Sequence, residues 1–402
     1  MSEQRKIDFS PPALIEDDIA AVVDVLRSGW ITTGSASRQF EAEIAAWAGT
    51  EDAVVLNSCT AALELALRLL GVGPGDEVIV PAYTYSASAA VVTHVGAMLV
   101  LLDSEPDDYA PSVDAYVNAV TPRTKAIIPV DLAGLPYPSD ELRRRLRERG
   151  VGRASRLLGD IGRPVVLVDA AHSFGAKRGG VAAGSLGDLT AFSFHAVKNL
   201  TTAEGGALTW RSGLEPASAT LSSDVRRLAL HGQSKDALAK HTAGAWEYDI
   251  IEPGYKANLP DVLAALGLSQ VHRYAMTLAH RRSLMGLYRL GLVGVVSDLV
   301  GSSATDGESS VHLAMVRLLE EDATRRNDLV QALAVCGVSA NVHYKPLPLL
   351  SAYQRLGFDA ADYPHATAHF EREITLPLHG HMTPDDVAYV LAVLCDLLGR
   401  QR

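Results

Sequence analysis

Lys198 is the residue whose position most strongly suggests chemistry. It follows the apolar run Ala191–His195, which is typical of a buried strand, and Gly205 and Gly206 close the polar stretch behind it. A lysine placed where a buried strand breaks into a tight loop is poorly solvated. Desolvation disfavours its ammonium form, so the amine can act as a nucleophile and move protons. Ser193 could hold an anionic group nearby, although a lysine that extends from a loop to water fits the same spacing.

A second strand, VVLVD, ends in an acid. Asp169 is preceded by apolar residues, so its carboxylate needs a cationic partner to stay charged. A protonated pyridine nitrogen would provide that partner and would make the ring an electron sink. His172 follows three positions later and could pack against such a ring or bind its hydroxyl. A helix-capping aspartate and a buried structural histidine would give the same pattern.

Two further strand ends carry polar or aromatic residues. Ser58, Cys59 and Thr60 lie between a strand and the helix AALELALRLL, where backbone amides and the helix dipole favour an anion. The same residues would also serve as a helix N-cap. Tyr85 follows another strand and could stack on a planar ring, or pack in a core or an interface.

Other patterns are weaker. The glycines of GVGPG precede a strand instead of following one, so they indicate a turn and not a dinucleotide-binding loop. His365 and His369, and His379 with His381, have no third convergent ligand, so no metal site is expected.

The elements that position these residues alternate along the chain. Strands and helices follow one another from about residue 52 to 207, which predicts an α/β fold with a mostly parallel sheet covered on both faces. The polar breaks fall at the carboxyl ends of the strands, where such sheets bind ligands. Pro11 and Pro12 predict a helix with proline in its first turn that stops at Gly29.

The remainder predicts a second lobe of α+β type. A long helix is expected over 258–290, a loop over 297–310, and strands at VHLAMVRL and VSANVHY. A last helix follows Thr383 and Pro384. We therefore expect an N-terminal segment (1–30) that packs with the small domain, a large domain (31–265) and a small C-terminal domain (266–402).

Composition narrows the functional classes. The chain has 402 residues, 48% of them hydrophobic, and a formal net charge of −11 without a basic tract, which disfavours nucleic-acid binding. Cys59, Cys336 and Cys395 fit no disulfide or zinc framework, which predicts a reducing compartment. The charged N-terminus indicates no signal peptide, and the uncharged stretch 86–102 predicts a helix and a strand, so a cytoplasmic protein with no membrane span is expected.

Six motifs in order resemble one known family. SGWITTG, NSCTAAL, PAYTY, VDAAHSFGA, SFHAVKN with AEGG, and PGYKANLPD are similar to the sugar aminotransferases of the DegT/DnrJ/EryC1/StrS family, which use pyridoxal phosphate. The resemblance covers nearly the whole chain. It implies the aspartate-aminotransferase fold (type I), in which a large domain with a mostly parallel seven-stranded sheet is followed by a smaller α+β C-terminal domain.

The resemblance also implies residue roles. Lys198 matches the Schiff-base lysine, Asp169 the acid that pairs with the pyridine nitrogen, and His172 the polar residue beside the ring. The remaining matches concern binding: an aromatic stack (Tyr85), phosphate contacts (Cys59, Thr60, Ser193), a phosphate contact to the neighbouring subunit (Asn258) and a region near the sugar (Thr32, His343, Tyr344). Cys59 departs from the pattern, since glycine or alanine is common there.

The implied activity is a transamination in two halves. An amino acid, expected to be L-glutamate, gives its amine to the cofactor, which becomes pyridoxamine phosphate, and a nucleotide-linked keto sugar then receives it. The implied assembly is a homodimer with shared active sites. A non-nucleotide cyclic ketone as acceptor, a non-catalytic sensor on the same fold, and a sugar oxidoreductase remain alternatives, the last disfavoured by the missing glycine fingerprint. The family's dehydratases have histidine at the lysine position, which Lys198 argues against.

Overall fold

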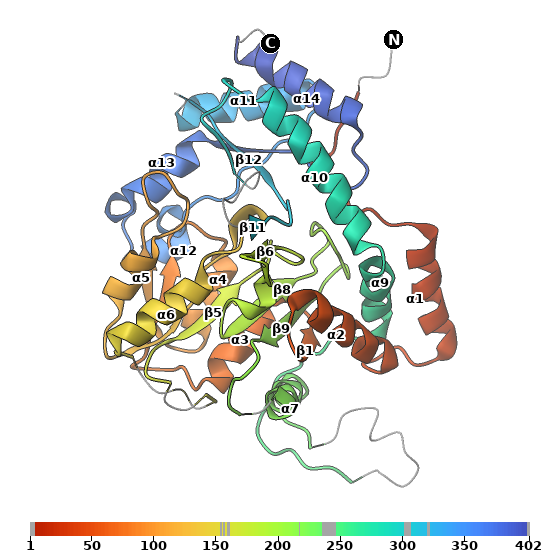
Figure 1. Cartoon of the computed structure of the whole chain (residues 1–402), viewed down its shortest axis with the longest axis vertical. Helices are drawn as coiled ribbons and strands as arrows, with labels where there is room; N and C mark the ends of the chain where they lie inside the picture. Colours follow the sequence, from red (N-terminus) through yellow and green to blue (C-terminus); the bar gives the residue numbers. More distant parts are fainter. Residues whose placement is uncertain are drawn as a thin grey trace.

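The computed structural model describes residues 5–152, 155, 157–158, 161–216, 218–234, 247–300, 307–319 and 322–399. Its centre is a seven-stranded sheet (Figure 1) of β1 (Ala53–Leu56), β2 (Glu77–Pro81), β3 (Met98–Leu102), β4 (Thr124–Ile127), β5 (Val165–Asp169), β8 (Leu189–Ser193) and β9 (Gly206–Trp210). The strand order is β1-β9-β8-β5-β4-β2-β3. Only β9 runs antiparallel to its neighbours within this sheet, which confirms the predicted mostly parallel sheet.

Helices cover both faces of this sheet. One core is formed with α3 (Cys59–Leu69), α4 (Ser86–His94) and α7 (Ser218–Ala229). The opposite core is formed with α2 (Ser35–Ala48), α5 (Val113–Ala119), α6 (Ser139–Arg149) and α9 (Asp261–Val271). The central strands are buried along their whole length, as a parallel sheet covered on both sides requires.

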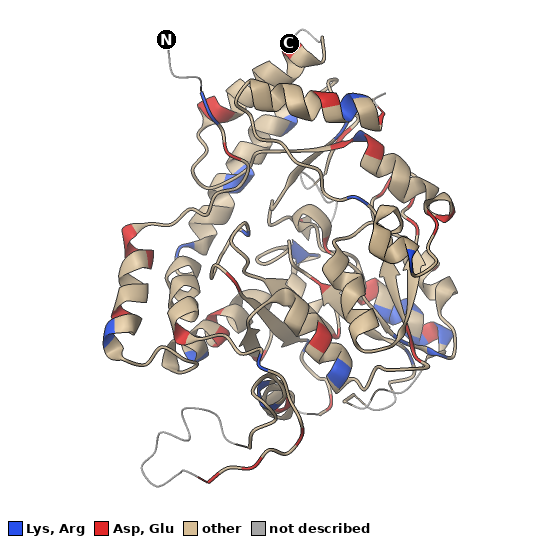
Figure 2. Ribbon diagram, turned by 180° about the vertical axis from the view of Figure 1, so that it is seen from behind, with Lys and Arg blue, Asp and Glu red and all other residues tan. Residues whose placement is uncertain are grey.

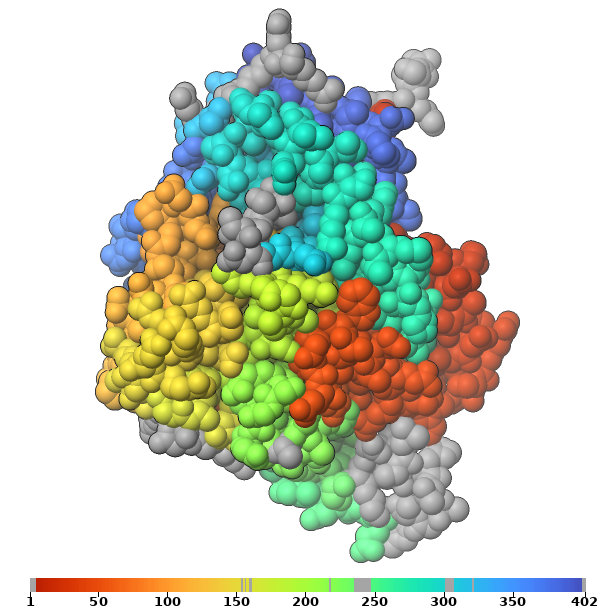
Figure 3. All heavy atoms as spheres, in the orientation of Figure 1, coloured from red at the N-terminus to blue at the C-terminus, as the bar shows by residue number. Residues whose placement is uncertain are grey.

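A second α+β unit follows. Its antiparallel sheet has the order β10 (Asp298–Val300), β12 (Ala314–Arg317), β13 (Glu373–Leu376). Its helices are α10 (Tyr274–Gly291), α11 (Ala323–Val335), α12 (Ser351–Gln354), α13 (Pro364–Arg372) and α14 (Pro384–Leu397). A small sheet of β11 (Gly307–Glu308), β6 (Lys177–Arg178) and β7 (Val181–Ala182) joins the two units. On the surface, α10 forms a continuous band from α9 to the C-terminal helices (Figure 3).

Several local predictions were wrong. The N-terminal helix, α1 (Glu16–Ser28), begins four residues after Pro12, because the Asp18 carboxylate accepts the Ile15 amide (2.9 Å) and fixes the start there. The stop at Gly29 is confirmed, with φ at 75° in the left-handed region.

Three predictions for the second lobe were also wrong. The long helix expected over 258–290 is two helices, α9 and α10, separated where Arg273 leaves helical geometry and its guanidinium binds Asp18 of α1 (2.5 Å). Part of the loop expected over 297–310 is β10, because buried Leu299 pairs with β12. The strand expected at VSANVHY is reduced to two single bridges, Ile7 with Val338 and Asn341 with Thr375. Residues 301–306 of that predicted loop lie outside the described residues.

The N-terminal segment contacts both units. Arg5 pairs with Asp386 of α14 (2.5 Å), and Ile7 belongs to the core of the second unit. In contrast, α1 packs along α9. The division into segments 1–30, 31–265 and 266–402 therefore stays a prediction.

Charge is distributed over the helices rather than concentrated. The positions of Lys and Arg and those of Asp and Glu are scattered over the ribbon (Figure 2). Exposed ion pairs join Arg144 with Glu148 and Arg145 with Asp114. Within the described residues, no helix combines the length and the apolar character needed to cross a bilayer.

One ion pair lies inside the large unit and yields a stability prediction. Arg163 and Asp188 are both buried and form two hydrogen bonds of 2.6 and 2.7 Å. Among the described residues, Arg163→Met would leave the Asp188 carboxylate with the partly exposed Arg211 as its one cationic partner in contact. We expect a loss of about 3–5 kcal/mol in the free energy of unfolding, measured by urea denaturation. Arg144→Met, which breaks an exposed pair, is the control and should cost about 1 kcal/mol or less; equal losses in the two variants would contradict the prediction.

Candidate active site

One cavity gathers most of the residues singled out in the sequence. It lies at the carboxyl ends of the central strands and has a volume of about 350 Å³. Ten of the twelve predicted site residues line it: Ser58, Cys59, Thr60, Tyr85, Asp169, His172, Ser193, Lys198, His343 and Tyr344. Thr84, Asp131, His195 and Glu204 are among the other lining residues. The chemistry-bearing strand ends therefore meet, as expected for an open α/β sheet.

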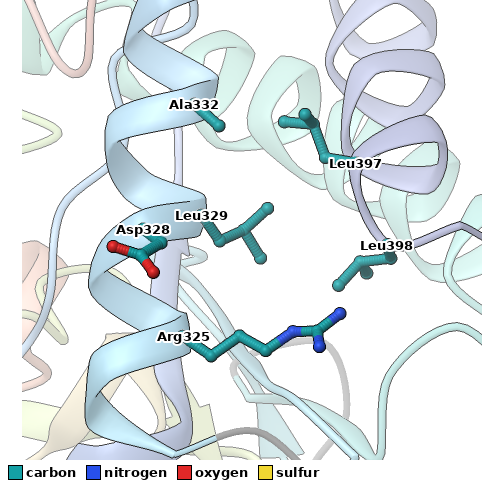
Figure 4. A pocket seen from close by; sticks show the side chains of 6 residues that line it. All are labelled: Arg325, Asp328, Leu329, Ala332, Leu397 and Leu398. Carbon is teal, nitrogen blue, oxygen red and sulfur yellow. The ribbon is translucent and has the colours of Figure 1, made fainter.

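Another cavity, of about 330 Å³, lies between α11 and α14 (Figure 4). Its lining combines Arg325 and Asp328 with apolar side chains. None of the predicted site residues lies there, so the chemistry of the chain belongs to the cavity at the strand ends.

Lys198 occupies the turn that follows β8. Its backbone amide donates to the carbonyl of His195 (2.9 Å), which carries the side chain back over the strand end. Burial lowers the pKa of Lys198 to about 8, and the nearby Asp169 and Cys59 offset part of that effect. About a tenth of the Lys198 side chain is therefore a neutral amine at pH 7, the form that a nucleophile requires.

This lowered pKa predicts how Lys198 reacts before any cofactor binds. Acetylation by acetic anhydride needs the neutral amine, so its rate should rise with pH to half its maximum near pH 8 instead of 10.5. At pH 7 the neutral fraction of Lys198 should be about 300 times that of an unperturbed lysine. Mass spectrometry of the Lys198 peptide measures the rate, with exposed Lys177 as the internal control. Identical pH profiles for the two lysines would contradict the prediction.

Asp169 ends β5 and is buried at the floor of the cavity. Its Oδ2 accepts the hydroxyl of Ser88 (2.6 Å), and its Oδ1 accepts the amide of Ala171 (3.2 Å) and the thiol of Cys59 (3.8 Å). Burial raises the pKa of Asp169, although these donors and Lys198 oppose the shift. In the part of the chain that the structure describes, no guanidinium or ammonium group forms an ion pair with Asp169. A buried carboxylate with neutral donors is suited to a cationic ligand atom.

An anion site lies beside this carboxylate. Ser58 caps α3 by accepting the amide of Ala61 (3.0 Å), and the first turn of α3 carries Cys59 and Thr60. The helix start is pressed against β9, because a Cβ on Gly206 would lie 2.4 Å from the Cys59 nitrogen. Ser193 on β8 lines the same cavity. A hydroxyl group and a helix N-terminus therefore face one space, which is an arrangement that binds phosphate groups.

His172 and Tyr344 form one unit. The Ala133 amide donates to Nδ1 of His172 (3.3 Å), so the ring proton resides on Nε2, which donates to the Tyr344 hydroxyl (2.9 Å). Burial lowers the pKa of His172 well below its ordinary value, with Lys198 adding to the effect, so the ring is neutral. Tyr85 is exposed and lies at the cavity with its ring 5.7 Å from that of Tyr344.

Two predicted residues lie outside the cavity lining. Asn258 donates to the hydroxyl of Thr33 (2.6 Å) and accepts from Lys256. Thr32 is exposed next to Thr33, and its carbonyl accepts the amide of Asp261 (3.2 Å). The structure thus brings Thr32 and Asn258 together outside the lining of this cavity.

Sequence reasoning missed three side chains of the site. Ser88 binds Asp169, and Asp131 lines the cavity with its carboxyl held by Ser173 and by the Tyr137 amide. Burial raises the pKa of Asp131 to about 7. His312 reaches Lys198 with 3.4 Å between Nε2 and Nζ. Ser88 follows Tyr85 by nearly one helical turn, so the two residues share a helix face. This spacing is the one sequence feature that could have indicated any of these three side chains.

The residues present fit pyridoxal phosphate. The buried Asp169 carboxylate suits a protonated ring nitrogen, the start of α3 with Ser193 suits the phosphate, and the low-pKa Lys198 amine suits an aldehyde. Tyr85 and His172 provide planar groups beside that space.

Comparisons with known proteins agree with this geometry. Residues 12–395 match the model of the DegT/DnrJ/EryC1/StrS aminotransferase family. The chain is 35% identical to the spore coat polysaccharide biosynthesis protein SpsC of Bacillus subtilis, over 98% of this chain and 97% of SpsC. It is 34% identical to the UDP-4-amino-4-deoxy-L-arabinose–oxoglutarate aminotransferase of Shewanella sediminis, over 97% of each chain.

A solved structure extends the agreement to three dimensions. The putative sugar aminotransferase Spr1654 of Streptococcus pneumoniae, in its PMP form, superposes with a TM-score of 0.93 at 45% identity, covering 98% of this chain and 99% of that one. Its PLP form superposes equally well. The predicted family, fold type, enzyme class and cofactor are therefore confirmed, and the chain belongs to the DegT/DnrJ/EryC1/StrS family of pyridoxal-phosphate-dependent sugar aminotransferases.

Proposed function

We propose that this aminotransferase moves the amino group of L-glutamate to a keto sugar carried on a nucleotide. The observation that carries the proposal is the meeting of Lys198, Asp169 and the anion site of α3 in one cavity. The names of two relatives support the finer assignment, since one refers to a UDP-linked amino sugar with oxoglutarate and the other to polysaccharide biosynthesis.

When bound, pyridoxal phosphate supplies an aldehyde and a conjugated ring that accepts negative charge from the carbon being deprotonated. Lys198 Nζ, as a neutral amine, would supply the nucleophile for that aldehyde and the base that moves a proton within the site. The Asp169 carboxylate would hold a cationic ring nitrogen, and Cys59, Thr60 and Ser193 would hold the phosphate, with Ser58 beside them at the start of α3. Neutral His172 donates to Tyr344, which orients that hydroxyl at the cavity wall.

We further propose a homodimer in which Asn258 reaches the phosphate site of the neighbouring subunit. In support, Asn258 and Thr32 lie together outside the cavity, in a region where Ile31 and Tyr255 are exposed. Mixing Lys198→Ala chains with Asn258→Ala chains tests this arrangement, because a mixed dimer contains one site with both native residues. Recovery of activity upon mixing supports shared sites, and no recovery contradicts them.

We also propose a cytoplasmic location, on the grounds of the three free cysteines, of which Cys59 and Cys395 are buried.

The acceptor is tested in two half-reactions. Purified protein loaded with pyridoxal phosphate is mixed with L-glutamate, and 2-oxoglutarate is measured. The aminated protein is then offered the same keto sugars with and without a nucleotide. Amination only of the nucleotide-linked sugars supports the proposal, whereas preference for free cyclic ketones selects the natural-product alternative. Absence of both half-reactions would indicate a non-catalytic sensor.

A further inference from the structure

His312 is the one imidazole in hydrogen-bonding distance of the Lys198 amine among the described residues. Its Nε2 lies 3.4 Å from Nζ of Lys198, and the residue is 4% exposed. It enters the site from the chain segment before β12, 114 residues beyond Lys198. None of the twelve residues predicted from the sequence makes this contact.

The orientation of the ring is set by Asn199. The Asn199 amide nitrogen donates to the carbonyl of Ser310 (2.7 Å), which leaves its Oδ1 facing Nδ1 of His312 (3.0 Å). A carboxamide oxygen only accepts, so Nδ1 of His312 carries the ring proton. Nε2 is then the unprotonated nitrogen, and its lone pair faces the amine of Lys198.

The backbone around His312 is held by a buried arginine. Arg281 of α10 donates from Nε to the carbonyl of Val311 (2.9 Å) and from Nη2 to the carbonyl of His312 (2.7 Å). The His312 amide donates to the carbonyl of Ala133 (3.2 Å). At Gly134 a Cβ would lie 3.0 Å from the His312 nitrogen, so the two segments touch directly. The imidazole is thus fixed from two sides.

The ring stays neutral in this setting. Burial lowers the pKa of His312 well below its ordinary value, and the cationic groups that face it, Lys198 and Arg281, act in the same direction together with the imidazoles of His172 and His343. The ring of His172 lies 4.5 Å away between centroids. His312 is therefore a hydrogen-bond acceptor and does not act as a general acid or base.

We infer that His312 is a positioning residue that accepts a hydrogen bond from Lys198 Nζ whenever that amine is not joined to the cofactor, with Asn199 fixing the required tautomer. The inference rests on the proposed role of Lys198. In the half-reactions the amine must return to the same carbon after each release. An acceptor at 3.4 Å keeps it inside the cavity and restricts the directions in which its protons and lone pair point.

The test uses acetylation of the cofactor-free protein. A hydrogen bond to a charged donor stabilises the ammonium form, so His312→Phe, which keeps a ring but removes the acceptor, should lower the pH of half-maximal Lys198 labelling by about one unit. His312→Gln, which can restore an acceptor oxygen, should return the midpoint toward that of the native protein. Asn199→Leu removes the acceptor that fixes the tautomer of His312. It should lower the pH of half-maximal Lys198 labelling as well, but by less than His312→Phe does. His381→Phe alters an exposed histidine outside the cavity and should leave it unchanged.

The outcomes separate the two proposals. A His312→Phe protein with a native melting temperature and an unchanged Lys198 midpoint would overturn the positioning role. If His312→Phe unfolds, the Asn199→Leu midpoint decides instead. The role of Lys198 is examined independently by borohydride reduction of native protein with pyridoxal phosphate: a label on another residue would refute that role, whatever the midpoints are. With the positioning role correct, kcat should fall about tenfold in His312→Phe while KM for glutamate changes little.

Discussion

Lys198→Ala is expected to lower the transamination rate by about 10⁴-fold and to abolish covalent capture of pyridoxal phosphate. Two functions are lost with one side chain: the amine that attacks the aldehyde, and the base that moves the proton between carbons. The structure supports both, because burial lowers the pKa of Lys198 to about 8 and the amine lies in the cavity lined by Asp169 and Ser193. The rate is measured as 2-oxoglutarate formed from glutamate, and capture as the borohydride-stable label on the Lys198 peptide.

Two variants separate chemistry from charge. Lys198→Arg keeps a cation at the position but offers no neutral amine, since the guanidinium is not deprotonated in proteins, so it should be as inactive as alanine. Lys177→Ala removes an exposed lysine of β6 and should change nothing. Partial recovery of Lys198→Ala by added methylamine would confirm that an amine is the missing group. Native activity or a native label in Lys198→Ala would refute the assignment.

The parts of the site that could be predicted lie at strand ends. An apolar run that stops at a single polar residue marks the point where a buried strand leaves the sheet. In a parallel sheet those points lie at one edge. Asp169, Ser193 and Lys198 each fit that rule, and they meet in one cavity. The mostly parallel sheet was predictable because most of its strands are apolar segments that alternate with helices, whereas the number of seven strands came from the family resemblance.

The parts that could not be predicted depend on contacts distant in sequence. His312 belongs to a segment that was interpreted as a plain strand, and its place beside Lys198 is created by Arg281 and Asn199. Glu373 is fully buried, where it accepts the amide of His343 (2.8 Å), and burial raises its pKa to about 8. A glutamate gives no local sign of such burial, and the sequence pattern predicts no strand at 373–376, where β13 lies.

The break between α9 and α10 has a similar origin. The helical pattern continues through residue 273, with no glycine or proline to end it. The ion pair of Arg273 with Asp18, formed only when α1 packs on α9, lies where the helix is interrupted. Periodicity identifies the helical region, and tertiary contacts decide where it is divided.

Asp169→Asn should weaken pyridoxal phosphate binding by about 10²- to 5 × 10³-fold, the second large effect expected for this chain. The substitution preserves the shape of the side chain but removes the charge that pairs with a cationic ring nitrogen, and it replaces one of the two acceptor oxygens by a donor. Breaking a buried pair costs about 3–5 kcal/mol. Dissociation constants from fluorescence quenching measure the effect. Asp140→Asn, at an exposed position of α6, should bind the cofactor normally.

The same substitution should stabilise the cofactor-free protein. Burial raises the pKa of Asp169 above its ordinary value of 3.8, so the folded protein keeps a proton that the unfolded chain has already lost. Stability of the cofactor-free protein therefore falls as pH rises from about 3.8 through the raised pKa, and Asp169→Asn removes this slope. Urea denaturation from pH 4 to 8 should show the variant gaining on the native protein as pH increases. A variant that binds the cofactor weakly and is also less stable at pH 8 would show that Asp169 stabilises the fold. A buried carboxylate whose role is to pair with a cationic ligand should destabilise the cofactor-free protein and stabilise only the protein with the ligand bound.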